Sequence, residues 1–152
     1  MSALTRETLD TWATDSFWQW MGLRIGSAGA DGATVCLDVQ PHHRGGGGTN
    51  AVNGGVVAYL CDAALGAAVA GLQWPPRMVT VSLNVTYLSP TVGQRITAEA
   101  VITSAGRTLV FADITVRNED GSTSAQGRAT ARIFTKQLTD PDVRARQNGD
   151  TP

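Results

Sequence analysis

This chain has almost no net charge and few cysteines, and each shortage excludes a class of protein. Lys and Arg number 12 against 13 Asp and Glu, so the net charge is -1 and no basic surface can hold a phosphate backbone. We therefore expect no nucleic-acid partner. The two cysteines, Cys36 and Cys61, are too few for a disulfide framework. Each lies in an apolar segment, and we expect both to be small core residues of a protein kept in a reducing compartment.

The chain also lacks a convincing targeting or membrane segment. Arg6, Glu7 and Asp10 come before any apolar run, so we expect no secretory signal peptide and a cytoplasmic protein. The run from Val56 to Leu72 approaches the shortest bilayer span in length, but Asp62 interrupts it and much of it is Ala and Gly. Strands that need a covering layer follow, so the prediction is a core helix and no membrane partner.

One stretch is distinguished by its single charge. Between Asn53 and Arg77 the only charged side chain is Asp62, in a run of mostly apolar and small residues. Asn50 or Asn53 can cap the first turn, and Pro75 after the run prevents its continuation. A helix that is apolar on every face lies inside a protein, where an unpaired carboxylate is costly. Asp62 is therefore the leading candidate functional residue.

The composition predicts one globular domain with short additions at both ends. Hydrophobic residues make up 42% and charged residues 16% of 152 residues, which is enough to bury one core. Residues 1–21 contain Trp12, Phe17, Trp18 and Trp20 at spacings typical of one or two short helices packed on the domain. The domain itself is expected over 22–135. The polar tail 136–152 is expected to be disordered.

The other segments read as strands. Two short ones flank the Asp31-Gly32 hairpin dipeptide. After the helix, apolar Val79 and Val81 alternate with polar Thr80 and Ser82 and the pattern continues to Tyr87, which predicts one apolar and one polar face. Further strands are expected at 94–104, 108–117 and 124–134. Consecutive strands without intervening helices pair antiparallel, and the sole long helix covers them, so the predicted class is α+β.

This order of elements resembles the hotdog fold, in which a curved antiparallel sheet of about six strands wraps one long central helix. The resemblance covers roughly Gly22 to Phe134. Within it, the chain is similar to the phenylacetyl-CoA thioesterase type of acyl-CoA thioesterases. That family's helix begins His-Gly-Gly with an Asp nine residues after the His, and here Asn53, Gly54, Gly55 and Asp62 hold those positions. The segments TVSLNVTYLSP from Thr80 and SAQGRATARIF from Ser124 also match in order.

The resemblance implies hydrolysis of an acyl-CoA, aryl or medium-chain, to the free acid and CoA with no cofactor and no metal. It implies Asp62 as general base or nucleophile, with Gly54 and Gly55 as oxyanion donors at the helix start and Thr80 orienting the water. Substrate-binding roles are expected for Asn53, Asn50 and Tyr59. The family's His is Asn53 here, and its additional upstream Asn is Gly47.

The sequence leaves several alternatives open. Asp62 could merely bond to a strand backbone, and the chain could be a non-catalytic acyl-CoA or ligand-binding hotdog protein. A hotdog enoyl-CoA hydratase pairs Asp with His, and this chain offers only His42 and His43. Cys61 adjoins Asp62 but points to another side of the helix. Four arginines could meet the coenzyme A phosphates: Arg107, Arg117, Arg128 and Arg132.

The expected assembly is a homodimer with shared active sites, often paired further into a homotetramer in the family that the chain resembles. Gly54 or Gly55 lies about 10 to 12 Å from Asp62 along one helix. A reacting carbonyl needs both groups within about 3 to 3.5 Å. Two antiparallel helices across a two-fold axis would bring the glycines of one subunit to the Asp62 of the other.

Overall fold

The structure is a computed structural model that describes residues 4–12, 14, 16–45, 48–73 and 77–134. The predicted tail over 136–152 and the departure at Gly47 lie outside the described residues. The described elements follow this order: α1 (Arg6–Trp12), α2 (Ser16–Trp20), β1 (Leu23–Gly29), β2 (Gly32–Asp38), the 3-10 turn η1 (Pro41–His43), α3 (Gly54–Leu72), β3 (Met78–Tyr87), β4 (Arg95–Ala105), β5 (Leu109–Arg117) and β6 (Thr123–Ile133).

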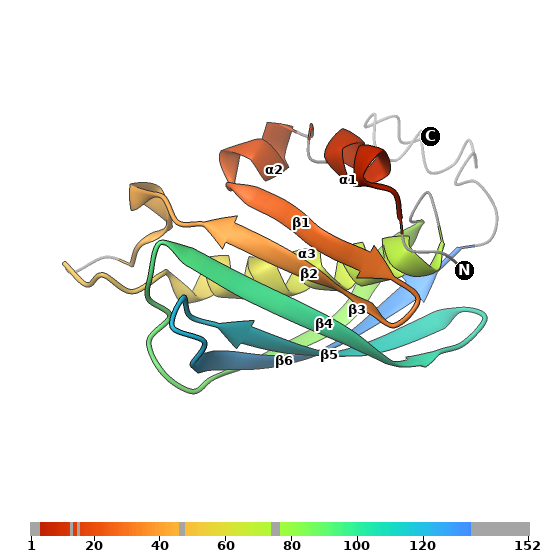
Figure 1. The fold of residues 1–152 in the computed structure, drawn as a ribbon. Coiled ribbons are helices and arrows are strands. Elements are labelled where there is room, and N and C mark those ends of the chain that lie inside the picture. The colour runs from red at the N-terminus through yellow and green to blue at the C-terminus, as the bar shows by residue number, and fades with distance from the viewer. Residues whose placement is uncertain (1–3, 13, 15, 46–47, 74–76, 135–152) are drawn as a thin grey trace, which may run out of the picture.

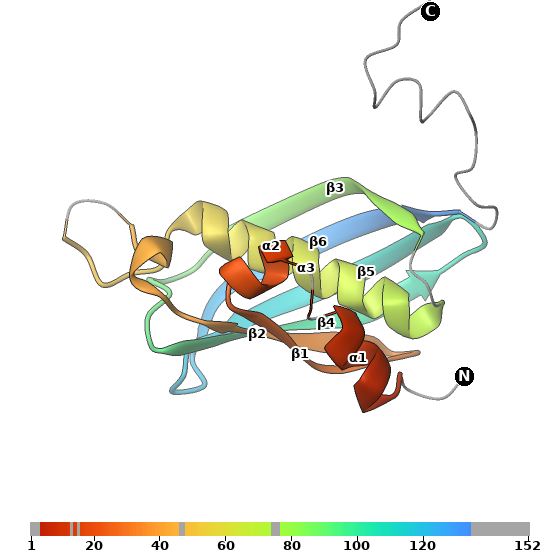
Figure 2. The same ribbon diagram turned by 90° about the horizontal axis from the view of Figure 1, so that it is seen from above.

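The strands form one antiparallel sheet that curves around α3 (Figure 1). Its order is β1-β2-β4-β5-β6-β3, and every neighbouring pair is antiparallel. The β1 and β3 strands are the two edges. Seen from above, α3 runs along the sheet and the short helices α1 and α2 lie on the same side as α3 (Figure 2). The predicted α+β class and hotdog architecture are confirmed.

The core lies between α3 and the concave face of the sheet. Small and branched residues of the helix, among them Leu60, Ala64 and Ala68, are fully buried against the sheet. By length and composition α3 could cross a membrane, but 61% of its most apolar window is buried inside the domain. Burial against a sheet is the ordinary reason for such a sequence in a core helix.

One stripe of α3 is not buried, which corrects the expectation that the helix is enclosed on every face. Gly55, Tyr59, Asp62 and Gly66 are spaced by four, three and four residues, so they lie on one side of the helix, and none of them is buried. The sheet covers the opposite side. Asp62 is therefore half-buried, with its carboxylate on the uncovered side of an otherwise apolar helix.

The predicted alternation of β3 is wrong at the start of the strand. A register shift between Thr80 and Ser82 leaves Val81 as an extra residue. This bulge inverts the faces before it, so Thr80 pairs with the buried Ala131 and faces the helix. Val79 and Val81, expected to be in the core, are instead 48% and 57% exposed.

The N-terminal segment is attached to the domain through its apolar side chains. Leu9 of α1 and Trp18 of α2 are buried in the common core, and the amide of Leu4 donates to the carbonyl of Ala28 at 3.1 Å.

The expectation that both cysteines are core residues is wrong for Cys36. Cys36 is only half-buried on β2, on the face turned away from the core. Cys61 is buried, as predicted.

Candidate active site

Asp62 and Thr80 come together across the helix and the sheet edge. The Thr80 hydroxyl donates to Asp62 Oδ1 at 2.7 Å, although the two residues are 18 positions apart. The bulge at Val81 makes this bond possible, because it turns Thr80 toward α3. Within the described residues Asp62 forms no salt bridge, so its carboxylate is held by a neutral donor and keeps lone pairs open for water.

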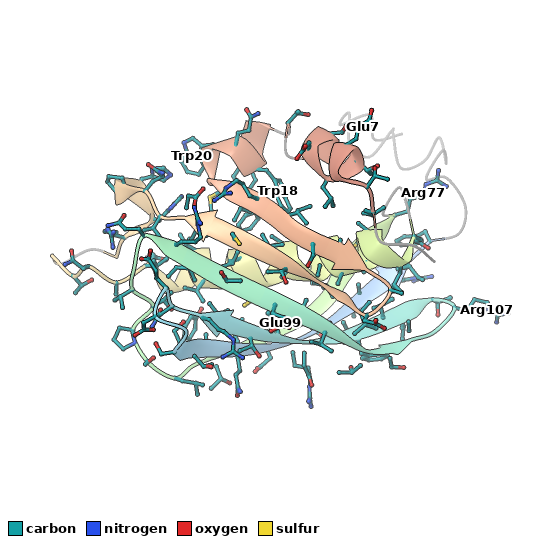
Figure 3. The ribbon with its side chains drawn as sticks, in the orientation of Figure 1. Glu7, Trp18, Trp20, Arg77, Glu99 and Arg107 are labelled. Atoms are coloured by element: carbon teal, nitrogen blue, oxygen red, sulfur yellow. The ribbon has the colours of Figure 1, made fainter. Side chains whose placement is uncertain are left out.

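A cavity of about 380 Å³ opens beside this pair. It is lined by Trp18, Tyr59, Asp62, Ala63, Gly66, Met78 and Thr80. The volume is within the range of small-molecule sites, and a few polar groups in an apolar wall are typical of them. Trp18 reaches the cavity from α2, beneath which its side chain lies in Figure 3. Tyr59 packs edge-to-face on Phe17 with ring centroids 5.2 Å apart.

The start of α3 distinguishes its two glycines. The side chain of Asn53 caps the helix, since its Oδ1 accepts from the Gly55 amide at 2.8 Å. This confirms that Asn53 can cap the first turn. The Gly54 amide donates to no acceptor among the described residues, while the Gly54 carbonyl accepts from the Tyr87 hydroxyl at 2.6 Å. Gly54 therefore offers the open N–H group of the first turn, and Gly55 does not.

His43 contacts the start of α3 through its backbone. The sequence did not predict this structural role. The His43 backbone carbonyl accepts from the Asn53 amide at 2.8 Å. Its Nδ1 accepts from the Gln40 amide at 2.9 Å, and its buried Nε2 has no partner within the described part of the chain. Burial, and secondarily the neighbouring His42, lower the pKa of His43. Nothing in the spacing of the two histidines distinguishes the buried one.

Other predicted contributors lie away from this cavity in the single chain. Asn50 is exposed, accepts from Arg44 through its carbonyl, and lines a separate hollow with Gly93 and Gln94. Arg128 forms a two-bond ion pair with Asp113 at 2.8 and 3.2 Å.

The other proposed phosphate-binding arginines are also dispersed. Arg117 donates to the Thr123 hydroxyl at 3.0 Å, and Arg132 lies over the Phe134 ring at 5.3 Å. Arg107 is at the tip of the β4–β5 hairpin (Figure 3). The single chain therefore gathers none of these four cations around Asp62.

Two other chemistries receive no support from the geometry. Burial, with a smaller contribution from Asp62, raises the pKa of the Cys61 thiol to about 12, so this residue is no thiolate nucleophile near neutral pH. Across the described residues, no group of three His, Cys, Asp or Glu side chains is placed to hold a metal ion. The arrangement can instead polarise a water at a carboxylate and present an open amide to a developing oxyanion.

Known proteins with similar sequences include thioesterases. The model of the thioesterase superfamily matches residues 49–125, which include the helix start, Asp62 and Thr80. Acyl-coenzyme A thioesterase 13 of Mus musculus is 33% identical over 102 residues, covering 65% of this chain and 71% of the mouse protein. The medium/long-chain acyl-CoA thioesterase YigI of Salmonella typhimurium is 30% identical over 115 residues, covering 66% of this chain and 74% of that protein.

The fold has close counterparts among solved structures. The PaaI protein from the phenylacetic acid degradation operon of E. coli superposes with a TM-score of 0.71 at 20% identity. The match covers 82% of this chain and 88% of PaaI. At this identity the likeness establishes the shared fold alone.

Proposed function

The chain belongs to the thioesterase superfamily and is a thioester hydrolase, and from this premise we propose that it hydrolyses an aryl- or medium-chain acyl-CoA to the free acid and CoA. The observation that carries the proposal is the Thr80 to Asp62 hydrogen bond of 2.7 Å in the lining of the cavity. A carboxylate in that position can act as a base or nucleophile on a bound substrate. Among the described residues it forms no ion pair that would explain its presence.

In the proposed reaction Asp62 acts on the thioester carbonyl through water or directly. As general base it takes a proton from the water while the water oxygen bonds to the carbonyl carbon. As nucleophile its own oxygen bonds to that carbon, and water then hydrolyses the resulting anhydride. In both routes the carbon–sulfur bond breaks, and the thiolate of CoA leaves and takes up a proton. Thr80 orients the Asp62 carboxylate and the attacking water.

The carbonyl oxygen becomes an anion during attack and needs a donor. The open Gly54 amide at the positive end of α3 is the group best suited to this role. Gly54 is eight residues before Asp62, about 12 Å along one helix, so one chain cannot place both groups on the same carbonyl. We propose that a second copy supplies Gly54, giving a homodimer with two composite sites.

Two features of the single chain support this assembly. The β3 strand is an edge of the sheet, and it carries the exposed Val79 and Val81. An exposed apolar edge is a surface that proteins ordinarily cover. The stripe of α3 that holds Asp62 is also uncovered, so a partner chain beside β3 would have access to it.

One panel of substrates tests the activity. Purified protein is mixed with phenylacetyl-CoA and straight-chain acyl-CoAs, and thiol release is followed with a thiol-trapping dye. Release above background for at least one substrate supports the proposal. Tight binding without release would make the chain a non-catalytic acyl-CoA-binding protein. The replacement of the family His by Asn53 is the reason to test this alternative. Enoyl-CoA consumption without thiol release would make it a hydratase.

Substitution of the pair tests the residues. We expect Asp62→Asn, which is nearly isosteric, to fold normally and to lower kcat by on the order of 10²-fold or more. Thr80→Ala should lose less, because Thr80 only orients, and Thr80→Ser should retain most activity because it keeps the hydroxyl. Steady-state kinetics and circular dichroism check both points. A folded Asp62→Asn protein with near-normal turnover would remove Asp62 from the mechanism.

A further inference from the structure

The cavity beside Asp62 has a direction along the central helix. Asp62 and Thr80 form its polar end. Gly66 lies four residues further along α3, about 6 Å by helix rise, and Met78 lies two residues earlier on β3, about 6.6 Å by strand rise. The two steps nearly agree, so Gly66 and Met78 lie at a similar distance from the Asp62–Thr80 pair, toward the C-terminal end of α3. Both of them line the same cavity.

The part of the cavity around Gly66 and Met78 is apolar. Ala63, Gly66 and Met78 offer no charged group, and Trp18 from α2 completes the lining. Trp18 is only 8% exposed and belongs to the core cluster, so it is a fixed wall. A group that extends from the polar end toward Gly66 would therefore exchange water for hydrocarbon contacts.

Gly66 is unusual because packing against the other described residues does not require a glycine there. A Cβ at this position would have no atom of another described residue within 4 Å, apart from the backbone of the helix itself. Gly71 in the same helix is the opposite case, since a Cβ there would collide with the backbone of Gly29. A glycine inside a helix lowers helix stability relative to Ala. At position 66 the visible result of that loss is open space along the cavity lining.

We propose that the acyl group lies along α3 from Asp62 toward its C-terminal half, and that Gly66 determines how long an acyl group the site accepts. The substrates would be unbranched or flat apolar acyl groups that pass over the Gly66 backbone between Met78 and Trp18. This inference rests on the proposed thioesterase function. It assigns specificity to Gly66, and leaves the reaction to Asp62 and Thr80.

Side chains of increasing size at Gly66 test the proposal, together with a variant at Trp18 that should enlarge the cavity. Gly66→Ala and Gly66→Leu are assayed with acyl-CoAs from two to twelve carbons. Each methylene that loses its place in an apolar pocket lowers kcat/KM about fourfold, so Gly66→Leu should lower the values for the longest good substrates by on the order of 10²-fold. Acetyl-CoA and propionyl-CoA should change by less than about threefold. Trp18→Leu, which removes the wall, should move the preference toward longer or bulkier groups.

Each other outcome has a defined meaning. An unchanged chain-length profile, or a loss that is equal at all lengths, would overturn the role of Gly66. So would a change of oligomeric state in Gly66→Leu by light scattering, because the open space would then belong to a partner chain. If the wild-type protein releases no thiol from any substrate, the proposed function fails by itself. Calorimetric titration of the same acyl-CoAs into Asp62→Asn and Asp62→Asn with Gly66→Leu then decides the inference through binding alone, with a chain-length-dependent difference in Kd supporting it and equal affinities overturning it.

Discussion

Gly54 and Gly55 are neighbours, but their amides have different partners. The Gly55 amide is taken by the Asn53 side chain, whereas the Gly54 amide has no acceptor among the described residues. The sequence allows either glycine as oxyanion donor. In the single chain only the Gly54 amide is open for this role. Asn53, which replaces the family His, has a structural use in this position because it caps the helix.

A substitution by proline would remove the Gly54 amide, and we expect it to leave the helix intact. Gly54 is the first helical residue, a position that proline tolerates well, and Asn53 before it has a polyproline-type backbone (φ -58, ψ 136) that is compatible with a following proline. We expect Gly54→Pro to fold and to lower kcat by about 10² to 10³-fold, the usual effect of losing one oxyanion donor. Gly54→Ala keeps the amide and is the matched control. Equal activity of the two variants would exclude this amide from catalysis.

His43 makes a prediction about pH. Its pKa is lowered in the folded protein, so the unfolded chain takes up a proton first, near the ordinary value of 6.5. Its contribution to stability is present above about pH 6.5 and is lost as the pH falls toward the lower folded value. The lowered pKa values of Asp38, Asp113 and Asp120 act in a separate window, because their ordinary value is 3.8.

The measurement is the free energy of unfolding by denaturant between pH 7.5 and 5. We expect it to decrease for the wild-type protein below pH 6.5, and to be flatter for His43→Gln. His42→Gln removes the exposed neighbouring imidazole and should keep most of the wild-type slope, because burial is the larger cause of the lowered His43 pKa and His42 the smaller one. If His43→Gln is as pH-dependent as the wild-type protein in this range, another group is responsible.

At the scale of elements, α3 and β3 together make the site, and each departs once from its regular pattern. The helix leaves one stripe uncovered, and the strand contains a bulge at Val81. Without the bulge, Thr80 would share the outer face with Asn84 and could not reach Asp62. The Asp62–Thr80 hydrogen bond therefore depends on one irregular residue in a strand.

The two glycines in the second half of α3 should respond in opposite ways to the same substitution. Gly71→Ala places a methyl group against the backbone of Gly29, which cannot move without shifting β1. We expect it to lower the free energy of unfolding by about 2 to 3 kcal/mol. Gly66→Ala meets open space and should raise that free energy by up to about 1 kcal/mol. Urea denaturation of both proteins checks this, and changes of the same sign would contradict it.

At the scale of the whole molecule, the separation of Gly54 from Asp62 makes a prediction about mixed assemblies. Inactive Asp62→Asn and inactive Gly54→Pro chains are co-expressed with different affinity tags, and mixed dimers are purified through both. One composite site then carries both lesions and the other carries none. We expect about half of the wild-type activity per dimer by this symmetry argument. Mixed dimers as inactive as their parents would exclude the shared site.

The sequence by itself determined the architecture and the principal catalytic candidate. The strand pattern, the single long apolar helix and its caps predict an α+β sheet around a helix, because local periodicity and burial depend on nearby residues. Asp62 was identifiable because a charge is rare in such a helix. The capping role of Asn53 followed from its residue type alone.

The tertiary structure decided which groups meet. Thr80 and His43 show the physical reason most clearly. Simple alternation places Thr80 on the outer face, and only the pairing of β3 with β6 fixes the extra residue that turns it inward. The burial of His43, the Tyr87 bond to Gly54 and the wall contributed by Trp18 likewise join segments far apart in the chain. These contacts arise from long-range packing and register, which the periodicity of each single segment does not specify.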